Sequence, residues 1–99
     1  MLGKKVDANQ KLIVGAFRQL GWTIFVTSDT GAGFPDTVGG YRGKNYLFEI
    51  KDGEKPLSAQ KLTVPQQMFH ENWRGQVTII RSVQDVIDFT NSLNKEGKP

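Results

Sequence analysis

The 99-residue sequence contains no cysteine and only one histidine, His70. The first absence excludes a disulfide framework and a zinc–thiolate centre, and the second excludes any site built from several histidines. A metal ion, if one binds, must then be held by carboxylate, backbone and water oxygens. Oxygen ligands of this kind favour Mg²⁺ or Mn²⁺ over Zn²⁺.

The sequence also lacks any uninterrupted apolar run near the roughly 18 residues that a membrane helix needs. Its first residues, Met1-Leu2-Gly3-Lys4-Lys5, have no apolar core of the kind that is typical of a secretory signal. We therefore expect a cytoplasmic protein with no membrane partner. The net charge is only +3 at pH 7, a small surplus that favours an anionic partner.

The length of the chain is sufficient for one domain and too short for two. The hydrophobic share of 37% is enough for a folded core, which excludes wholesale disorder. We predict a single domain over residues 1–99, with an ordered core over about 6–93 and frayed ends.

Apolar periodicity and turn residues predict the element order helix, strand, strand, strand, helix, strand, helix. The expected bounds are a helix over 7–20, strands over 22–27, 36–41 and 45–51, a helix over 63–73, a strand over 76–81 and a helix over 82–93. The link over 42–44 is short enough for a hairpin, so the second and third strands should be antiparallel neighbours. The predicted fold class is α/β, a small mixed sheet flanked by helices, with a loop over 52–61.

Two carboxylates and a lysine stand in an order that suggests a metal-dependent phosphodiesterase site. Pro35-Asp36 begins one predicted strand, and Glu49-Ile50-Lys51 ends the next. Because side chains alternate along a strand, Glu49 and Lys51 share one face, which we expect to be open to solvent. Two neighbouring carboxylates repel unless a cation or a proton lies between them. The same residues also fit an ordinary structural role, as a turn aspartate and an exposed Glu-x-Lys pair.

The pattern Gly33-Phe34-Pro35-Asp36, then Glu49-Ile50-Lys51, then a helix with Gln66-Gln67, resembles the PD-(D/E)xK nuclease superfamily. Within it, the chain is most similar to the small, stand-alone virus-type replication-repair nuclease (VRR-NUC) domains of phages. The element order is also similar to that of the archaeal Holliday-junction resolvases. The resemblance extends from the first predicted helix to the last predicted strand.

The resemblance implies a restriction-endonuclease-like fold and Mg²⁺- or Mn²⁺-dependent endonucleolytic cleavage of DNA, in branched structures such as Holliday junctions. Asp36 and Glu49 would be metal ligands, and the backbone carbonyl of Ile50 would complete the coordination. Lys51 would position or activate the attacking water. The resemblance also implies a homodimer, located in the host cell cytoplasm if the chain is phage-encoded.

Gln10 stands where the relatives carry a glutamate on the first helix. It either helps to hold the metal or its waters, or forms a capping box with Asp7. Asp7 and Asn9 are alternatives if the register of the helix differs. An amide binds a cation more weakly than a carboxylate does, so this position departs from the family pattern.

The relatives also place a glutamine on the second helix, close to the site. Thr63 and Gln66 have the spacing of a capping box, which would fold Gln66 back onto the start of its helix. We therefore predict that Gln67 reaches the site. His70, one turn further along, is interpreted as a packing residue.

Residues that flank the motif in the sequence are candidates for contact with DNA phosphates. They are Ser28, Arg42, Lys44, Lys55 and Lys61. Two alternatives to a nuclease stay open: a non-catalytic module that binds double-stranded nucleic acid, and a degenerate nuclease. The first leaves Asp36 and Glu49 unexplained, because carboxylates beside phosphates are unfavourable without a cation.

Overall fold

The computed structural model describes residues 8–96, so the predicted helix cap at Asp7 lies outside the described residues. The elements follow one another as α1 (Ala8–Gln19), β1 (Thr23–Val26), β2 (Thr37–Tyr41), β3 (Lys44–Ile50), the 3₁₀ helix η1 (Leu57–Gln60), α2 (Val64–Asn72), β4 (Thr78–Ile80) and α3 (Val83–Glu96). The predicted order of helices and strands is confirmed. The differences are at the ends of elements and in segment 52–61, predicted as a loop, where η1 forms.

The four strands make one mixed sheet in the order β1-β2-β3-β4. β1 and β2 pair antiparallel, as do β2 and β3, while β3 and β4 are parallel. The predicted hairpin is confirmed: Tyr41 pairs with Lys44 across a two-residue turn in which Arg42 and Gly43 have φ of 52° and 83°. Positive φ at both turn residues matches the twist of the flanking strands.

β4 is shorter than predicted because a side chain replaces its first backbone pairing. The Gln76 amide accepts a hydrogen bond from the Leu47 N–H at 2.7 Å and donates one to the Leu47 carbonyl at 2.9 Å. Gln76 therefore imitates a strand residue beside β3 without belonging to the ladder. The parallel pairing of β3 begins only at Phe48, opposite Thr78.

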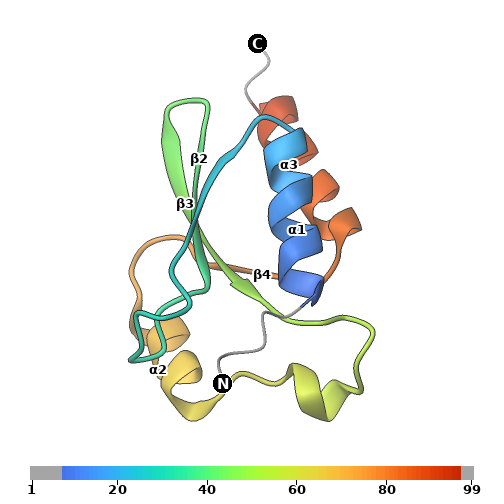
Figure 1. Ribbon diagram of the computed structural model, residues 1–99. Coiled ribbons are helices and arrows are strands. Elements are labelled where there is room, and N and C mark those ends of the chain that lie inside the picture. The colour runs from blue at the N-terminus through green and yellow to red at the C-terminus, as the bar shows by residue number, and fades with distance from the viewer. Residues whose placement is uncertain (1–7, 97–99) are drawn as a thin grey trace.

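Helices α1 and α3 cover one face of the sheet, and the hydrophobic core fills the space between them (Figure 1). Buried residues from the helices and strands form it: Ile13, Val14, Phe17, Trp22, Ile24, Phe48, Ile50, Ile80 and Val86. The indole N–H of Trp22 donates a hydrogen bond to the Thr90 hydroxyl at 2.9 Å, which offsets the cost of burying this polar group. The core therefore packs one face of β3 against the two helices.

The end of β3 that carries the predicted motif lies away from the hairpin tip, in the part of the molecule that holds α2 and η1 (Figure 1). Both elements belong to the connection that leads from β3 through α2 to the parallel strand β4. Among residues 8–96, no helix is both long and apolar enough to cross a membrane.

Candidate functional site

Asp36 is held at the entrance to β2 by hydrogen bonds from two directions. The Thr27 N–H donates to the Asp36 carbonyl at 2.7 Å, and the Thr27 hydroxyl donates to the Pro35 carbonyl at 2.8 Å. On the other side, the N–H of Ile50 donates to Oδ2 of Asp36 at 2.8 Å. The Asp36 carboxylate is thereby fixed against the end of β3. Asp36 is thirteen residues from Glu49 in the sequence but is its neighbour in space.

Glu49 is buried, with 1% of its surface exposed, so the prediction of a solvent-open face for this residue is wrong. Its neighbours Phe48 and Ile50 are buried as well, because both faces of this end of β3 are covered. α1 and α3 cover one face, and the start of α2 reaches the other through Gln66, whose Nε2 donates to Oε2 of Glu49 at 3.1 Å. Glu49 is therefore a buried carboxyl group rather than half of an exposed ion pair.

Gln66, and not Gln67, contacts the motif, which corrects the prediction that Gln67 reaches the site. The capping box predicted at Thr63 is present, and the Gln66 Oε1 accepts from the Thr63 N–H at 2.9 Å. The same oxygen also accepts from the Lys51 ammonium at 2.8 Å. The prediction assumed that the helix cap would leave Gln66 unable to bind anything else. Its amide oxygen accepts from both Thr63 and Lys51, while its amide nitrogen donates to Glu49. Gln67 instead donates to Glu71 at 3.0 Å on the exposed side of α2.

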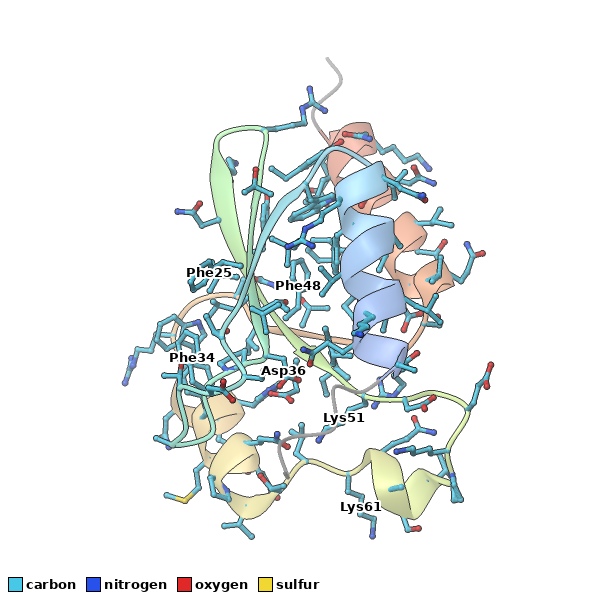
Figure 2. The ribbon with its side chains drawn as sticks, viewed as in Figure 1. Phe25, Phe34, Asp36, Phe48, Lys51 and Lys61 are labelled. Atoms are coloured by element: carbon cyan, nitrogen blue, oxygen red, sulfur yellow. The ribbon has the colours of Figure 1, made fainter. Side chains whose placement is uncertain are left out.

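Lys51 follows the last residue of β3 and continues the pairing with β4, because its N–H donates to the Ile80 carbonyl at 3.0 Å. Its own carbonyl accepts a hydrogen bond from the Asn9 side chain at 3.0 Å. Figure 2 shows Lys51 and Asp36 at the same end of the sheet, below the buried Phe48. The start of α1, the end of β3 and the start of α2 thus converge on this lysine.

Asn9, and not Gln10, is the α1 residue whose side chain is hydrogen-bonded to this end of β3. In the described part of the chain, no hydrogen bond joins Gln10 to Asp36 or Glu49, whereas the adjacent Asn9 is bonded to the Lys51 backbone. Asn9 was one of the two alternatives if the register differed, and its side chain is bonded to the backbone of the motif residue Lys51. The capping role proposed for Gln10 depends on Asp7, which lies outside the described residues.

The environment of Glu49 raises its pKa to about 9, far above the usual range of a carboxyl group. Burial is the largest cause, because an ionised carboxylate loses its hydration. The Asp36 carboxyl, which lies within hydrogen-bonding reach and adds a like charge, raises the pKa further, while the positive charge of Lys51 opposes both. Without a cation, the Asp36–Glu49 pair therefore holds a proton at neutral pH.

His70 is partly buried on α2, one turn beyond Gln66, and its Nε2 atom has no hydrogen-bond partner among the described residues. Burial lowers the pKa of His70, and the nearby charge of Lys51 lowers it further. The imidazole is therefore neutral at pH 7. The sequence interpretation, a packing residue, is compatible with this position.

The five predicted DNA-contacting residues fall in three separate places. Arg42 and Lys44 lie at the hairpin tip, at the opposite end of the seven-residue strand β3 from the motif (Figure 1). Arg42 is also bonded to Asn94 of α3 at 2.9 Å. Lys55 and Lys61 are exposed on the segment that follows the motif, and Ser28 is exposed on the loop after β1.

The residues present are suited to a divalent cation with few protein ligands. Among the described residues, no group of three or more histidine, cysteine, aspartate or glutamate side chains could hold a metal. Two carboxylates are nevertheless enough for Mg²⁺, which commonly retains several waters and takes further oxygens from a phosphate substrate. The Oε1 atom of Glu49 is buried and accepts no hydrogen bond from a donor among the described residues, so it is satisfied either by a proton shared with Asp36 or by a bound cation.

Comparisons of the chain with protein-family models, with curated proteins and with solved structures give no match. The case for a function therefore rests on the chemistry of Asp36, Glu49, Lys51 and Gln66. The resemblance to the PD-(D/E)xK nucleases stays a prediction.

Proposed function

We propose that this chain is a divalent-metal-dependent DNA endonuclease with a restriction-endonuclease-like fold, of the PD-(D/E)xK superfamily and similar to the VRR-NUC domains. The observation that carries the proposal is the buried Oε1 of Glu49, which accepts no hydrogen bond from a donor among the described residues and lies beside the Asp36 carboxyl. A fold keeps such a pair only at a cost in stability, and sites where stability is given up are commonly functional.

In this proposal Asp36 and Glu49 hold Mg²⁺ or Mn²⁺, with the Ile50 carbonyl as a further ligand. The bound cation supplies electrostatic stabilisation of the charge that develops on the phosphate. The N–H of Ile50 fixes the orientation of the Asp36 carboxylate through its 2.8 Å bond. The remaining positions are left for water and for a phosphate oxygen of the substrate.

Lys51 contributes the positive charge that phosphodiester hydrolysis needs near the attacking water or the developing negative charge. Gln66 orients this lysine, because its Oε1 accepts from the ammonium while its Nε2 binds Glu49. The amide thus sets the distance between the cationic group and the carboxylate. The proposed substrate is branched DNA such as a Holliday junction, and two cuts at one junction require a homodimer.

One observation favours a second candidate, a degenerate nuclease that binds DNA without cutting it. The described residues provide only two acidic side chains at the site, and no hydrogen bond connects Gln10 to them. Binding of double-stranded nucleic acid without hydrolysis would then be the function that remains.

The deciding experiment incubates the protein with labelled four-way junction, flap and linear duplex DNA in Mg²⁺, Mn²⁺ or EDTA. We expect metal-dependent incision, which Asp36→Asn and Lys51→Ala reduce by at least about 100-fold, as loss of a catalytic group does. The matched controls are Asp88→Asn and Lys95→Ala, on the exposed surface of α3, which should cut like the wild type.

Incision that survives Asp36→Asn contradicts the proposed site. Binding without incision under every metal condition supports the degenerate nuclease. A sizing measurement tests the dimer separately, since a strict monomer would not cut both strands of a junction in concert.

A further inference from the structure

The segment that directly follows the motif, residues 52–61, exposes a leucine near its middle. Leu57 begins η1 and has 81% of its surface exposed, more than any other large hydrophobic residue described. Figure 1 shows η1, the short yellow-green helix, standing away from the sheet on the side opposite α2, and Figure 2 shows Lys61 at the same edge of the molecule. An apolar side chain held in water in this way gains nothing for the fold of the chain itself.

Segment 52–61 is nevertheless ordered from within, by a buried glutamine. Nε2 of Gln60 donates to the Lys55 carbonyl at 2.7 Å and to the Gly53 carbonyl at 3.3 Å. Its Oε1 accepts from Nε of Arg81 at 3.0 Å, which ties the segment to the residue after β4. Gln60 is 9% exposed, so these bonds are largely shielded from water.

The base of the segment is fixed as well. The Gly53 N–H donates to the Arg81 carbonyl at 3.1 Å, and a Cβ at Gly53 would lie only 3.0 Å from that oxygen. The Ala59 N–H closes the turn by donating to the Pro56 carbonyl at 2.8 Å. Leu57 is therefore presented on a rigid support, and a rigid support reduces the entropy lost when a group binds.

Charge identifies the kind of surface that this leucine meets. Lys55 and Lys61 flank Leu57 and are both exposed, and no acidic residue lies between them. The acidic residues Asp52 and Glu54 precede Lys55, at the base of the segment. An exposed leucine between two lysines, six residues after Lys51 of the proposed site, matches an apolar wedge held against a phosphate backbone.

We propose that Leu57 inserts between two bases of the DNA next to the cleaved phosphate, while Lys55 and Lys61 contact the phosphates on either side. This inference rests on the proposed function, because it assigns the DNA of that same site. Inserting an apolar side chain unstacks a base step, which costs free energy in continuous duplex. At a branch point the step is not held by two continuous strands and opens more easily, so the wedge favours branched over linear DNA.

The test places 2-aminopurine, whose fluorescence rises when it is unstacked, at the branch point of a four-way junction and at the matching position of a linear duplex. Binding is measured with the full chain in Ca²⁺ and in EDTA, and incision in Mg²⁺. Leu57→Ala is compared with Leu57→Phe, which keeps an apolar wedge. The control is Leu12→Ala, which truncates another exposed leucine, on α1, with 65% of its surface exposed.

We expect the wild type and Leu57→Phe to raise the fluorescence of the junction and Leu57→Ala to abolish most of the rise. Leu57→Ala should also lower the preference for junction over duplex by about fivefold or more, in line with the loss of one contact to a base. Leu12→Ala should behave like the wild type. Because the Leu57 side chain is 81% exposed, neither substitution there should disturb the fold, and circular dichroism checks that each variant is folded.

The outcomes separate this inference from the proposed function. Metal-dependent incision with a fluorescence rise that is unchanged in Leu57→Ala overturns the wedge and leaves the nuclease standing. A Leu57-dependent rise without incision in any metal supports the wedge and overturns the nuclease. Absence of binding to every DNA overturns both.

Discussion

Gly33 packs directly against the backbone of Pro65, so closely that a Cβ at Gly33 would overlap the Pro65 carbonyl group. Gly33 also has a φ of 77°, which favours glycine. The following ring, Phe34, makes an edge contact with Phe69 of α2, with centroids 5.5 Å apart. The loop that leads to Asp36 is therefore packed against the start of the helix that delivers Gln66.

Gly33→Ala should push α2 away from the loop and weaken the contacts of Gln66, whose N atom would lie 2.9 Å from the added Cβ. The matched control is Gly31→Ala, because Gly31 has a similar φ of 83° but nothing within 4 Å of its added Cβ. Both variants carry the backbone penalty of about 1 kcal/mol or more. We expect Gly33→Ala to lose at least tenfold more Mg²⁺ affinity and incision rate than Gly31→Ala, beyond any shared loss of Tm. Equal effects in both variants would show that the packing of the loop on α2 does not position the site.

The sequence was sufficient for those parts of this site that depend on local patterns. Periodicity and turn residues predicted the elements, and the spacing of Thr63 and Gln66 predicted the cap. The burial of Glu49 could not be predicted, because it depends on α2 folding back over the second face of β3. The role of Gln66 was missed because the helix cap was assumed to exclude a contact with Glu49, seventeen residues away. One amide makes both contacts.

The raised pKa of Glu49 predicts a pH-dependent loss of stability in the metal-free protein. The folded state keeps a proton that the unfolded state releases near pH 4.5, so the free energy of unfolding falls as pH rises from there toward about 9. Glu49→Gln removes the titration and keeps the shape. In EDTA at pH 8 we expect it to raise the free energy of unfolding by roughly 2–4 kcal/mol and Tm by at least about 5 °C, while abolishing metal binding.

Denaturant unfolding of the wild type and Glu49→Gln between pH 4 and pH 9 measures this effect. The two proteins should be similarly stable at pH 4 and diverge above pH 5. A constant difference across the range would mean that Glu49 is ionised in the fold without metal. Asp88→Asn, which alters an exposed carboxylate on α3, should change neither the stability nor its slope.

Metal binding should release the proton that the Asp36–Glu49 pair holds. Because Glu49 is protonated below about pH 9 and a metal ligand must be ionised, the affinity for Mg²⁺ should rise about tenfold per pH unit between pH 6 and pH 8. Calorimetry in two buffers with different ionisation enthalpies should detect close to one proton released per site at pH 7.5. A Kd that does not change with pH over this interval contradicts the assignment of Glu49 as a ligand.

Gln66 and Gln67 provide a direct test of which amide serves the site. Gln66→Ala removes the bonds to Glu49 and Lys51 as well as half of the capping box, so we expect a loss of about 1–2 kcal/mol in stability. Incision should fall much further than that loss explains, by about 100-fold. Gln67→Ala, which breaks only an exposed bond to Glu71, should remain close to the wild type in both measurements.

Gln66→Glu separates the two roles of this side chain. A carboxylate keeps the acceptor for Thr63 and Lys51, so the helix cap should survive, as helicity and Tm would show. It cannot donate to Glu49 when ionised and adds a third carboxyl group to the site, so the pH profile of incision should shift toward alkaline pH. A variant with normal Tm and an unchanged pH profile would limit Gln66 to a capping function.

The salt dependence of DNA binding should distinguish the lysines of segment 52–61 from those of the hairpin tip. Each lysine that neutralises a phosphate releases a counterion and contributes about one unit to the slope of log K against log salt. Lys55→Ala and Lys61→Ala should each reduce that slope by about one, since both lysines are exposed on the segment that adjoins the motif. Lys44→Ala should leave the slope unchanged, because Lys44 begins β3 and the motif ends it. If Lys44→Ala alone lowers the slope, the DNA lies across the hairpin tip. The proposal that Lys55 and Lys61 contact phosphates beside the carboxylates would then be wrong.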